Sequence, residues 1–143
     1  MSSPVGTRGT DYEMVVERGK IAEFAAAMQS QNPAYAGPGA IVPPTFLMSS
    51  SLWAPDGAAV DVGFDRRRLL HGEQEFTFHG PPPRAGQTLR VSEQVVDRYE
   101  KPGKKGGMMR FAVVVTEYRG EDGTLVAEAR KTLIETAPRG GAS

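Results

Sequence analysis

Apolar and polar positions in the first third of the chain predict one strand and one helix. The run Tyr12-Glu13-Met14-Val15-Val16 is typical of a short strand. The residues Ile21, Phe24, Ala25 and Met28 then follow the i, i+3, i+4, i+7 spacing that places side chains on one helical face. This spacing predicts a helix over residues 18–29. Its start is poorly defined, because Gly19 falls in the expected first turn.

A second helix is predicted over residues 44–52. Pro44 suits the first position of a helix, where its missing N–H is not needed. The residues that follow are mostly apolar or small, among them Phe46, Leu47 and Met48. Such a composition favours a helix that is buried rather than one on the surface.

After Arg68 the pattern changes to a period of two, which is typical of strands. Phe76 and Phe78 alternate with polar residues, and further runs cover residues 89–95, 109–118 and 125–134. Residues 101–107 and 120–123 are rich in turn formers, so we expect successive strands to be antiparallel neighbours. The whole pattern predicts an α+β domain in which an antiparallel sheet wraps around a central helix, the hot-dog fold. The edge strands of such a sheet favour dimerisation.

The amino-acid composition excludes several classes of function. The chain has 143 residues, with 17 Lys and Arg against 17 Asp and Glu and no cysteine. One domain is expected, and a balanced charge disfavours nucleic acid or an anionic membrane as a partner. The absence of cysteine excludes disulfides and a cysteine nucleophile. Neither a leader nor a membrane span is evident, so we expect a cytoplasmic protein. We predict a folded domain over residues 10–136, with flexible ends at residues 1–9 and 137–143.

Five ordered motifs resemble the N-terminal dehydratase domain of the MaoC-like family. They are Tyr12-Glu13-x-x-Val16-Glu17-Arg18-Gly19-Lys20-Ile21, Asn32-Pro33-Ala34-Tyr35, Val42-Pro43-Pro44-Thr45-Phe46, Leu70-His71-Gly72-Glu73-Gln74-Glu75-Phe76 and Arg84-Ala85-Gly86-Gln87-Thr88-Leu89. The resemblance covers residues 12–135. It implies a hot-dog fold and hydration or dehydration of an acyl thioester, carried by CoA or an acyl-carrier protein, without a further cofactor.

The same resemblance implies that the catalytic groups are missing here. Active members carry Asp-x-Asn-Pro-x-His, whose aspartate and histidine activate water. This chain has Ser30 and Tyr35 in those two places. Active members also place His-Gly at the start of the second helix, where a glycine N–H binds the thioester oxygen; Pro43-Pro44 stands there instead. The segment between Tyr35 and Ile41 is also shorter than in the family.

We therefore expect a non-catalytic, substrate-binding subunit of a heteromeric (3R)-hydroxyacyl-thioester dehydratase or enoyl-thioester hydratase. Its partner would be a MaoC-like hot-dog subunit that carries the dyad. No residue is expected to be catalytic and none to bind a metal. The expected substrate-binding residues are Asn32, Tyr35, Thr45, Phe46, Trp53, His71 and Gly72.

Other interpretations stay open. The chain could be a homo-oligomeric enzyme, either a hydratase with relocated groups such as His71 or a thioesterase, or a plain acyl-thioester binding module. Asn32-Pro33 could simply end the first helix, and Phe46, Met48 and Trp53 could be core. Strand alternation places His71 with Glu73, Glu75, Thr77 and His79 on one polar face. A basic group could contact substrate phosphates or be solvated charge; it comprises Arg98, Lys101, Lys104, Lys105 and Arg110.

Overall fold

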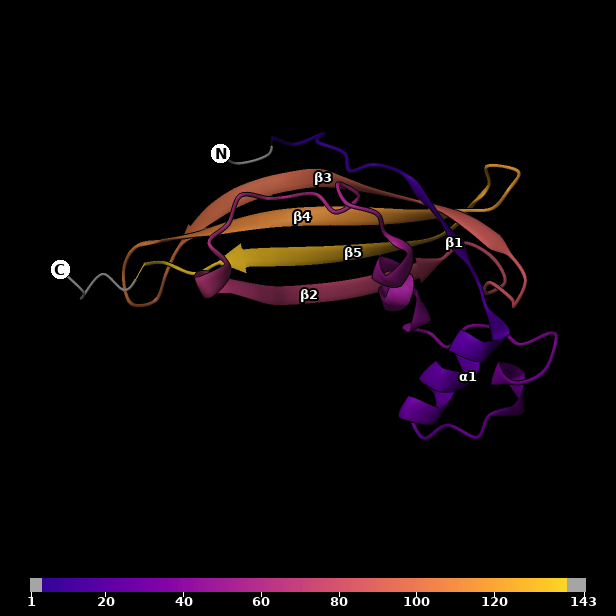
Figure 1. The fold of residues 1–143 in the computed structure, drawn as a ribbon. Helices are drawn as coiled ribbons and strands as arrows, with labels where there is room; N and C mark the ends of the chain where they lie inside the picture. The colour runs from indigo at the N-terminus through magenta and orange to yellow at the C-terminus, as the bar shows by residue number, and fades with distance from the viewer. Residues whose placement is uncertain (1–3, 139–143) are drawn as a thin grey trace.

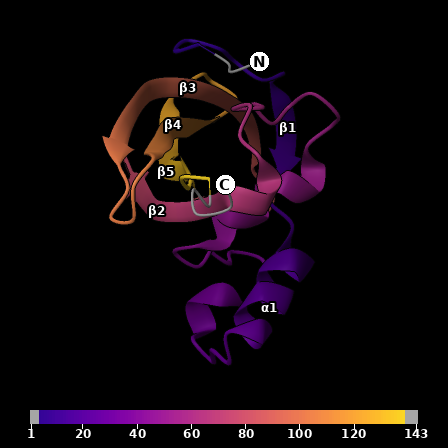
Figure 2. The ribbon, with the colours of Figure 1, turned by 90° about the vertical axis from the view of Figure 1, so that its left-hand side faces the viewer.

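Five antiparallel strands form one curved sheet in the order β1-β3-β4-β5-β2 (Figure 1). The computed structural model describes residues 4–138. The strands are β1 (Tyr12–Val15), β2 (Leu69–Phe78), β3 (Thr88–Pro102), β4 (Met108–Arg119) and β5 (Leu125–Glu135). Seen from one end, the strands curl so that β3 and β2 lie on opposite sides of the molecule (Figure 2). The predicted α+β class is confirmed.

The predicted turns join β3 to β4 and β4 to β5 as antiparallel neighbours. The expectation that successive strands are neighbours is wrong for β2 and β3. Strand β2 pairs with β5, and β3 pairs with β1 and β4. The link between β2 and β3 contains Pro81, Pro82 and Pro83. Proline fixes φ and lacks an N–H, so this link does not form a tight hairpin.

The helical segments are α1 (Arg18–Ala27), η1 (Pro33–Tyr35), η2 (Phe46–Trp53) and η3 (Arg66–Arg68). The predicted first helix is confirmed, and its N-cap residue makes no side-chain cap bond. The predicted second helix is present as η2, which begins at Phe46 rather than Pro44 and is a 3-10 helix. One local bond favours this geometry: Ser49 Oγ donates to Phe46 O at 2.7 Å, and such bonds compete with the α-helix. Phe46 and Leu47 are buried, but Met48 and Leu52 are exposed.

The main core joins the helical segments to one end of the sheet. Ile21 from α1 and Phe46 and Leu47 from η2 pack with Met14, Leu89 and Val91. The rings of Phe24 and Phe46 meet edge to face, with centroids 5.5 Å apart. Beyond this cluster, α1 lies outside the curl of the sheet in both views (Figures 1 and 2).

An extended segment, residues 54–65, connects η2 to η3 along the inner face of the sheet; we call it the strap. Val62 packs in a second apolar cluster with Val95, Ala112 and Val114. Three charged side chains of the sheet bind strap backbone groups. Glu93 Oε1 accepts from Val60 N at 3.0 Å, Arg98 Nη2 donates to Val62 O at 2.7 Å, and Glu135 Oε2 accepts from Asp65 N at 2.6 Å.

The N-terminal segment contacts both the strap and β3, and Thr10 N donates to Gly57 O of the strap at 3.0 Å. Gly6 N and Gly9 N donate to carbonyl oxygens of β3, at 2.8 and 2.9 Å. The fold therefore begins before residue 10, where the sequence analysis placed its start. A Cβ at Gly9 would lie 1.8 Å from the carbonyl oxygen of Ala58 in the strap, so only glycine fits there. The predicted flexibility of residues 1–3 and 139–143 lies outside the described residues.

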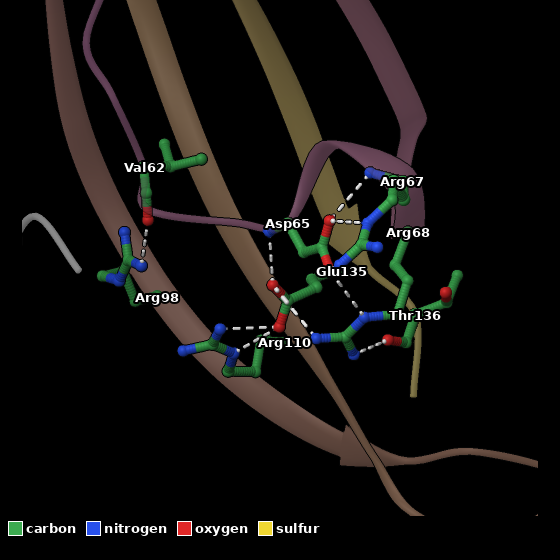
Figure 3. Close-up of polar contacts among 8 residues, drawn as sticks. All are labelled: Val62, Asp65, Arg67, Arg68, Arg98, Arg110, Glu135 and Thr136. Carbon is green, nitrogen blue, oxygen red and sulfur yellow. Dashed lines mark hydrogen bonds and ion pairs between the residues drawn. The ribbon is translucent and has the colours of Figure 1, made fainter. Parts of the chain in front are cut away.

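Glu135 makes the shortest of the three hydrogen bonds to the strap, and Figure 3 shows it together with its arginine partners. Its side chain is only 4% exposed, and Arg110 Nη2 lies 2.6 Å from Oε1. Burial alone would raise the pKa of Glu135. The hydrogen bond from Asp65 N and the charges of Arg110 and Arg68 outweigh it, so the pKa lies below its ordinary value.

We predict that Glu135→Gln lowers the free energy of unfolding by about 2 kcal/mol at neutral pH, because charge-assisted hydrogen bonds are lost. The lowered pKa means that this contribution is complete above the ordinary carboxyl pKa of about 4.3 and is lost as pH falls through the folded value. Urea unfolding of both proteins at several pH values measures the difference. It should shrink below about pH 4.

The control is Glu128→Gln on the same strand, since Glu128 makes only an exposed pair with His79 at 3.1 Å. An equal loss in both variants would contradict the assigned role of Glu135.

Candidate functional site

The segment that resembles a catalytic motif forms a capped turn. Ser30 Oγ accepts from Asn32 N at 3.3 Å, and Asn32 Oδ1 accepts from Ala34 N at 3.0 Å at the start of η1. Asn32 is exposed and Ser30 is half-buried. Tyr35 is half-buried against the main core. The Asn32 side chain thus serves the local backbone, as an N-cap residue does.

The predicted residues of the second helix lie mainly in the core. Phe46 is 1% exposed, and Trp53 is half-buried against the same cluster. Thr45 is exposed, and its side chain does not cap η2. Met48, weighed above as core, is exposed and lines the cavity described next.

A cavity of about 270 Å³ lies between η2, the strap and the inner face of the sheet. We call it the strap cavity. Among the seven predicted binding residues, only His71 lines it. Its apolar wall includes Leu47, Phe76 and Ala129, and its polar wall includes Tyr12, Ser50, His71, Gln74, Glu93, Thr116, Tyr118 and Lys131.

A β-bulge brings His71 to the cavity. The register of β2 on β5 shifts between His71 and Glu73, so Gly72 is the extra residue. His71 consequently joins Gln74 and Phe76 on the cavity wall. The predicted alternation, which grouped His71 with Glu73, is therefore wrong at this residue. A Cβ at Gly72 would lie 2.7 Å from Ile134 Cδ1, so the close approach of Ile134 favours glycine.

A row of hydroxyl groups borders the cavity. Tyr118 OH donates to Leu47 O at 3.0 Å and lies 3.1 Å from Ser50 Oγ. Burial raises the pKa of Tyr118, and the hydrogen bond with Ser50 opposes this only in part. Burial likewise raises the pKa of Tyr12, and the nearby Ser50 hydroxyl opposes this only in part. Both phenols therefore stay protonated at neutral pH and act as hydrogen-bonding groups rather than bases.

Two charged side chains, Glu93 and Lys131, also line the cavity. Lys131 Nζ lies 3.9 Å from Glu93 Oε1, which is an ion-pair distance too long for a hydrogen bond. Glu93 is held by Val60 N. Within residues 4–138, the side chains of His71 and Gln74 make no hydrogen bond.

The basic residues considered above as a phosphate site contact different aromatic rings. Arg98 and Arg110 point toward Phe64, with their guanidinium carbons 5.2 and 5.3 Å from the ring centre. Burial and the charge of Arg110 lower the pKa of Arg98. Lys101 lies over Tyr99 on the same strand. These residues therefore form no common phosphate cradle.

Sequence reasoning missed Tyr12, Glu93, Tyr118 and Lys131. A signal was present, because each of Glu93, Thr116 and Lys131 is a polar residue between apolar neighbours at i−2 and i+2. Such a residue on an inward face marks a cavity or a buried contact. Among residues 4–138 no three His, Asp or Glu side chains are arranged to hold a metal ion, and no helix is long and apolar enough to cross a membrane.

Comparisons with known proteins agree with this architecture. The family model of the FAS1-like dehydratase domain region matches residues 3–129. A UPF0336 protein of Saccharopolyspora erythraea is 35% identical over 130 residues, covering 83% of this chain and 80% of that protein. The 3-hydroxyacyl-thioester dehydratase Y of Mycobacterium tuberculosis is 43% identical over 82 residues, covering 54% of this chain and only 26% of that protein.

A solved structure supports the fold. The C-terminally truncated HadBC (3R-hydroxyacyl-ACP dehydratase) complex of Mycobacterium tuberculosis aligns with a TM-score of 0.74 and 25% identity. The alignment covers 94% of this chain and 99% of that chain. The expected hot-dog fold is confirmed.

The bulge at Gly72 gives a prediction about packing. Gly72→Ala should lower the free energy of unfolding by about 1 kcal/mol, because the new methyl group meets Ile134 Cδ1. Ile134→Val removes that atom, so Gly72→Ala should cost less in its background. Denaturant unfolding of the four proteins of this double-mutant cycle measures the coupling. Strict additivity would show that the Ile134 contact does not decide the residue at position 72.

Proposed function

Because this chain belongs to the family of FAS1-like dehydratase domain regions, we propose that it is the non-catalytic, substrate-binding subunit of a heteromeric (3R)-hydroxyacyl-thioester dehydratase or enoyl-thioester hydratase. The observation that carries the proposal is the replacement of the acid–base pair by Ser30 and Tyr35. A serine or tyrosine hydroxyl cannot replace the carboxylate and imidazole that act together as the general base of this chemistry.

The start of η2 supports the same proposal. Hydratase chemistry needs a donor that stabilises the developing enolate oxygen. Pro44 has no N–H, and Phe46 N already donates to Pro43 O at 3.0 Å. The backbone at this place is therefore poorly suited to bind a thioester oxygen.

Surface features favour a partner subunit. Strand β2 is an edge of the sheet and has a neighbouring strand, β5, on one side only within residues 4–138. Exposed apolar side chains lie on β2 and η2: Leu69, Leu70, Met48 and Leu52. An open strand edge with apolar neighbours favours association with another sheet. The partner in this proposal is a hot-dog subunit that carries the Asp/His pair, and the substrate is an acyl thioester of CoA or of an acyl-carrier protein.

One observation favours a second candidate, a homo-oligomeric hydratase with relocated catalytic groups. His71 faces the strap cavity, which Glu93 and Tyr12 also line. An imidazole in a cavity is a candidate general base. The two candidates differ in one property, namely whether this chain alone catalyses hydration.

We predict that the purified chain does not hydrate crotonyl-CoA and that His71→Ala leaves this result unchanged. Co-expression with a dyad-bearing hot-dog subunit should give an active complex. The assay follows loss of the absorbance of the conjugated thioester. Hydration by the chain alone, abolished by His71→Ala, would establish the second candidate instead.

Restoring the aspartate and histidine of the family motif should not make this chain an active hydratase. We predict that Ser30→Asp with Tyr35→His gives no measurable hydration, because a missing oxyanion donor typically costs about 10²- to 10³-fold in rate. Adding Pro43→His and Pro44→Gly should raise the rate above that of the two-residue variant. Full activity from the two-residue variant would show that the oxyanion donor lies elsewhere.

A further inference from the structure

Strand β2 is one edge of the sheet (Figure 1), and its outer face is acidic. Within residues 4–138 it has one neighbour, β5, so its other side is open to a strand of another subunit. Glu73 and Glu75 are both exposed. Because side chains alternate along a strand, the two carboxylates share the face opposite to that of Gln74 and Phe76, which line the strap cavity.

The sheet itself does not pair these two carboxylates. In the register of β2 on β5, Glu73 lies opposite Thr132 and Glu75 lies opposite Arg130. Neither glutamate forms an ion pair or a hydrogen bond within residues 4–138. The edge therefore presents two unpaired negative charges to any strand that adds to it, and only Glu75 has a basic neighbour.

These charges act against pairing with a second copy of the chain. Two identical edges pair as antiparallel strands about a two-fold axis, so a residue before the axis meets the residue equally far after it in the other copy. A register centred on Gln74 places Glu73 opposite Glu75 twice. Centring on either glutamate places that glutamate opposite its own copy. Like charges directly opposite each other destabilise a strand pair.

The remaining registers pair the strand poorly. Because β2 spans Leu69–Phe78, a register centred on His71 or on Phe76 leaves only half of the strand to pair. A register centred on Gly72 sets the two β-bulges against each other, and a bulge disrupts the regular ladder. The registers that pair most of the strand without opposed bulges are therefore those that oppose glutamates.

Charges also occur on edges that pair with nothing, but β2 has other features of a pairing strand. An edge that is blunted against all partners is short, contains proline or points a charge inward. Strand β2 has 10 residues and no proline, and its inner face carries no carboxylate, lysine or arginine. Leu69 and Leu70 at its start are 38% and 53% exposed. These features favour a partner that is selected by charge.

We propose that the β2 edge excludes a second copy of this chain and accepts the edge strand of a hot-dog subunit that carries lysine or arginine opposite Glu73 and Glu75. The inference rests on the proposed function, which makes the partner another hot-dog subunit. Opposite charges directly across a strand pair stabilise it, whereas identical chains bring like charges together. The two carboxylates thereby select a heteromeric assembly over a homomeric one.

A variant of the chain itself serves as the basic partner. Glu73→Lys with Glu75→Lys reverses the charge of the edge and leaves the rest of the chain unchanged. Sedimentation velocity measures the dissociation constants of the wild type, of this variant and of their equimolar mixture. We expect the mixed pair to associate about tenfold more tightly than either protein with itself, because repulsive pairs become attractive. The difference should shrink as salt is added, because exposed charges are screened.

A neutral variant tests the same point without an added lysine. Glu73→Gln with Glu75→Gln should self-associate about tenfold more tightly than the wild type, because the repulsion is lost. The matched control is Glu100→Lys with Glu121→Lys, which changes the net charge equally at exposed residues outside β2. A mixture of this control with the wild type should associate no more tightly than the wild type alone.

Three results would overturn the inference. The first is a wild type that self-associates as tightly as the glutamine variant. The second is a mixture with the lysine variant that gains no more than the control mixture. The third is a lack of association in both the lysine mixture and the glutamine variant, because charge would then not be what keeps two copies apart.

The reconstituted complex separates this inference from the proposed function. Glu73→Lys with Glu75→Lys in this chain should weaken its assembly with the dyad-bearing subunit about tenfold. Assembly and hydration that are unchanged by the two lysines would overturn the inference and leave the function standing. Hydration of crotonyl-CoA by this chain alone would overturn the function. The association ratios would then still decide whether the edge selects its partner by charge.

Discussion

Three charged side chains on the inner face of the sheet hold the backbone of the strap, and the site depends on this arrangement. Glu93, Arg98 and Glu135 each bind a backbone group of residues 60–65. Buried backbone groups need partners because they have lost water, and buried charges need partners for the same reason. The strap has no regular backbone ladder of its own, so the sheet supplies the bonds. In return, the strap backbone gives each of these charged side chains one hydrogen-bond partner.

The position of the strap separates two regions of the inner face. At one end Val62 enters a packed apolar cluster, whereas nearer η2 the strap stands away from the sheet and leaves the cavity. The chain therefore has a shaped cavity, whereas the segment that corresponds to the catalytic motif is a turn capped by Asn32. Binding and chemistry become physically separable in such a molecule. The proposed division between a binding subunit and a catalytic subunit follows from that separation and from the family to which the chain belongs.

Much of the fold follows from local patterns, because side-chain alternation and turn residues act over short distances. Strands β3, β4 and β5 and helix α1 lie where their periodicity predicts them. The errors arise where one residue changes the pattern. A local bond of Ser49 favours the 3-10 geometry of η2, and the bulge at Gly72 moves His71 to the other face. The cavity was missed because its polar residues come from all five strands and η2, and only the register of the sheet brings them together.

The central claim, that this chain contributes binding but no chemistry, is tested most directly in the reconstituted complex. The measurement is the hydration rate after the aspartate and histidine of the dyad-bearing partner are both replaced by alanine, with this chain left unchanged. The account predicts that all measurable activity is lost while acyl-CoA binding to the complex persists. A residual rate that disappears on His71→Ala in this chain would contradict it, because the catalytic base would then lie in the strap cavity.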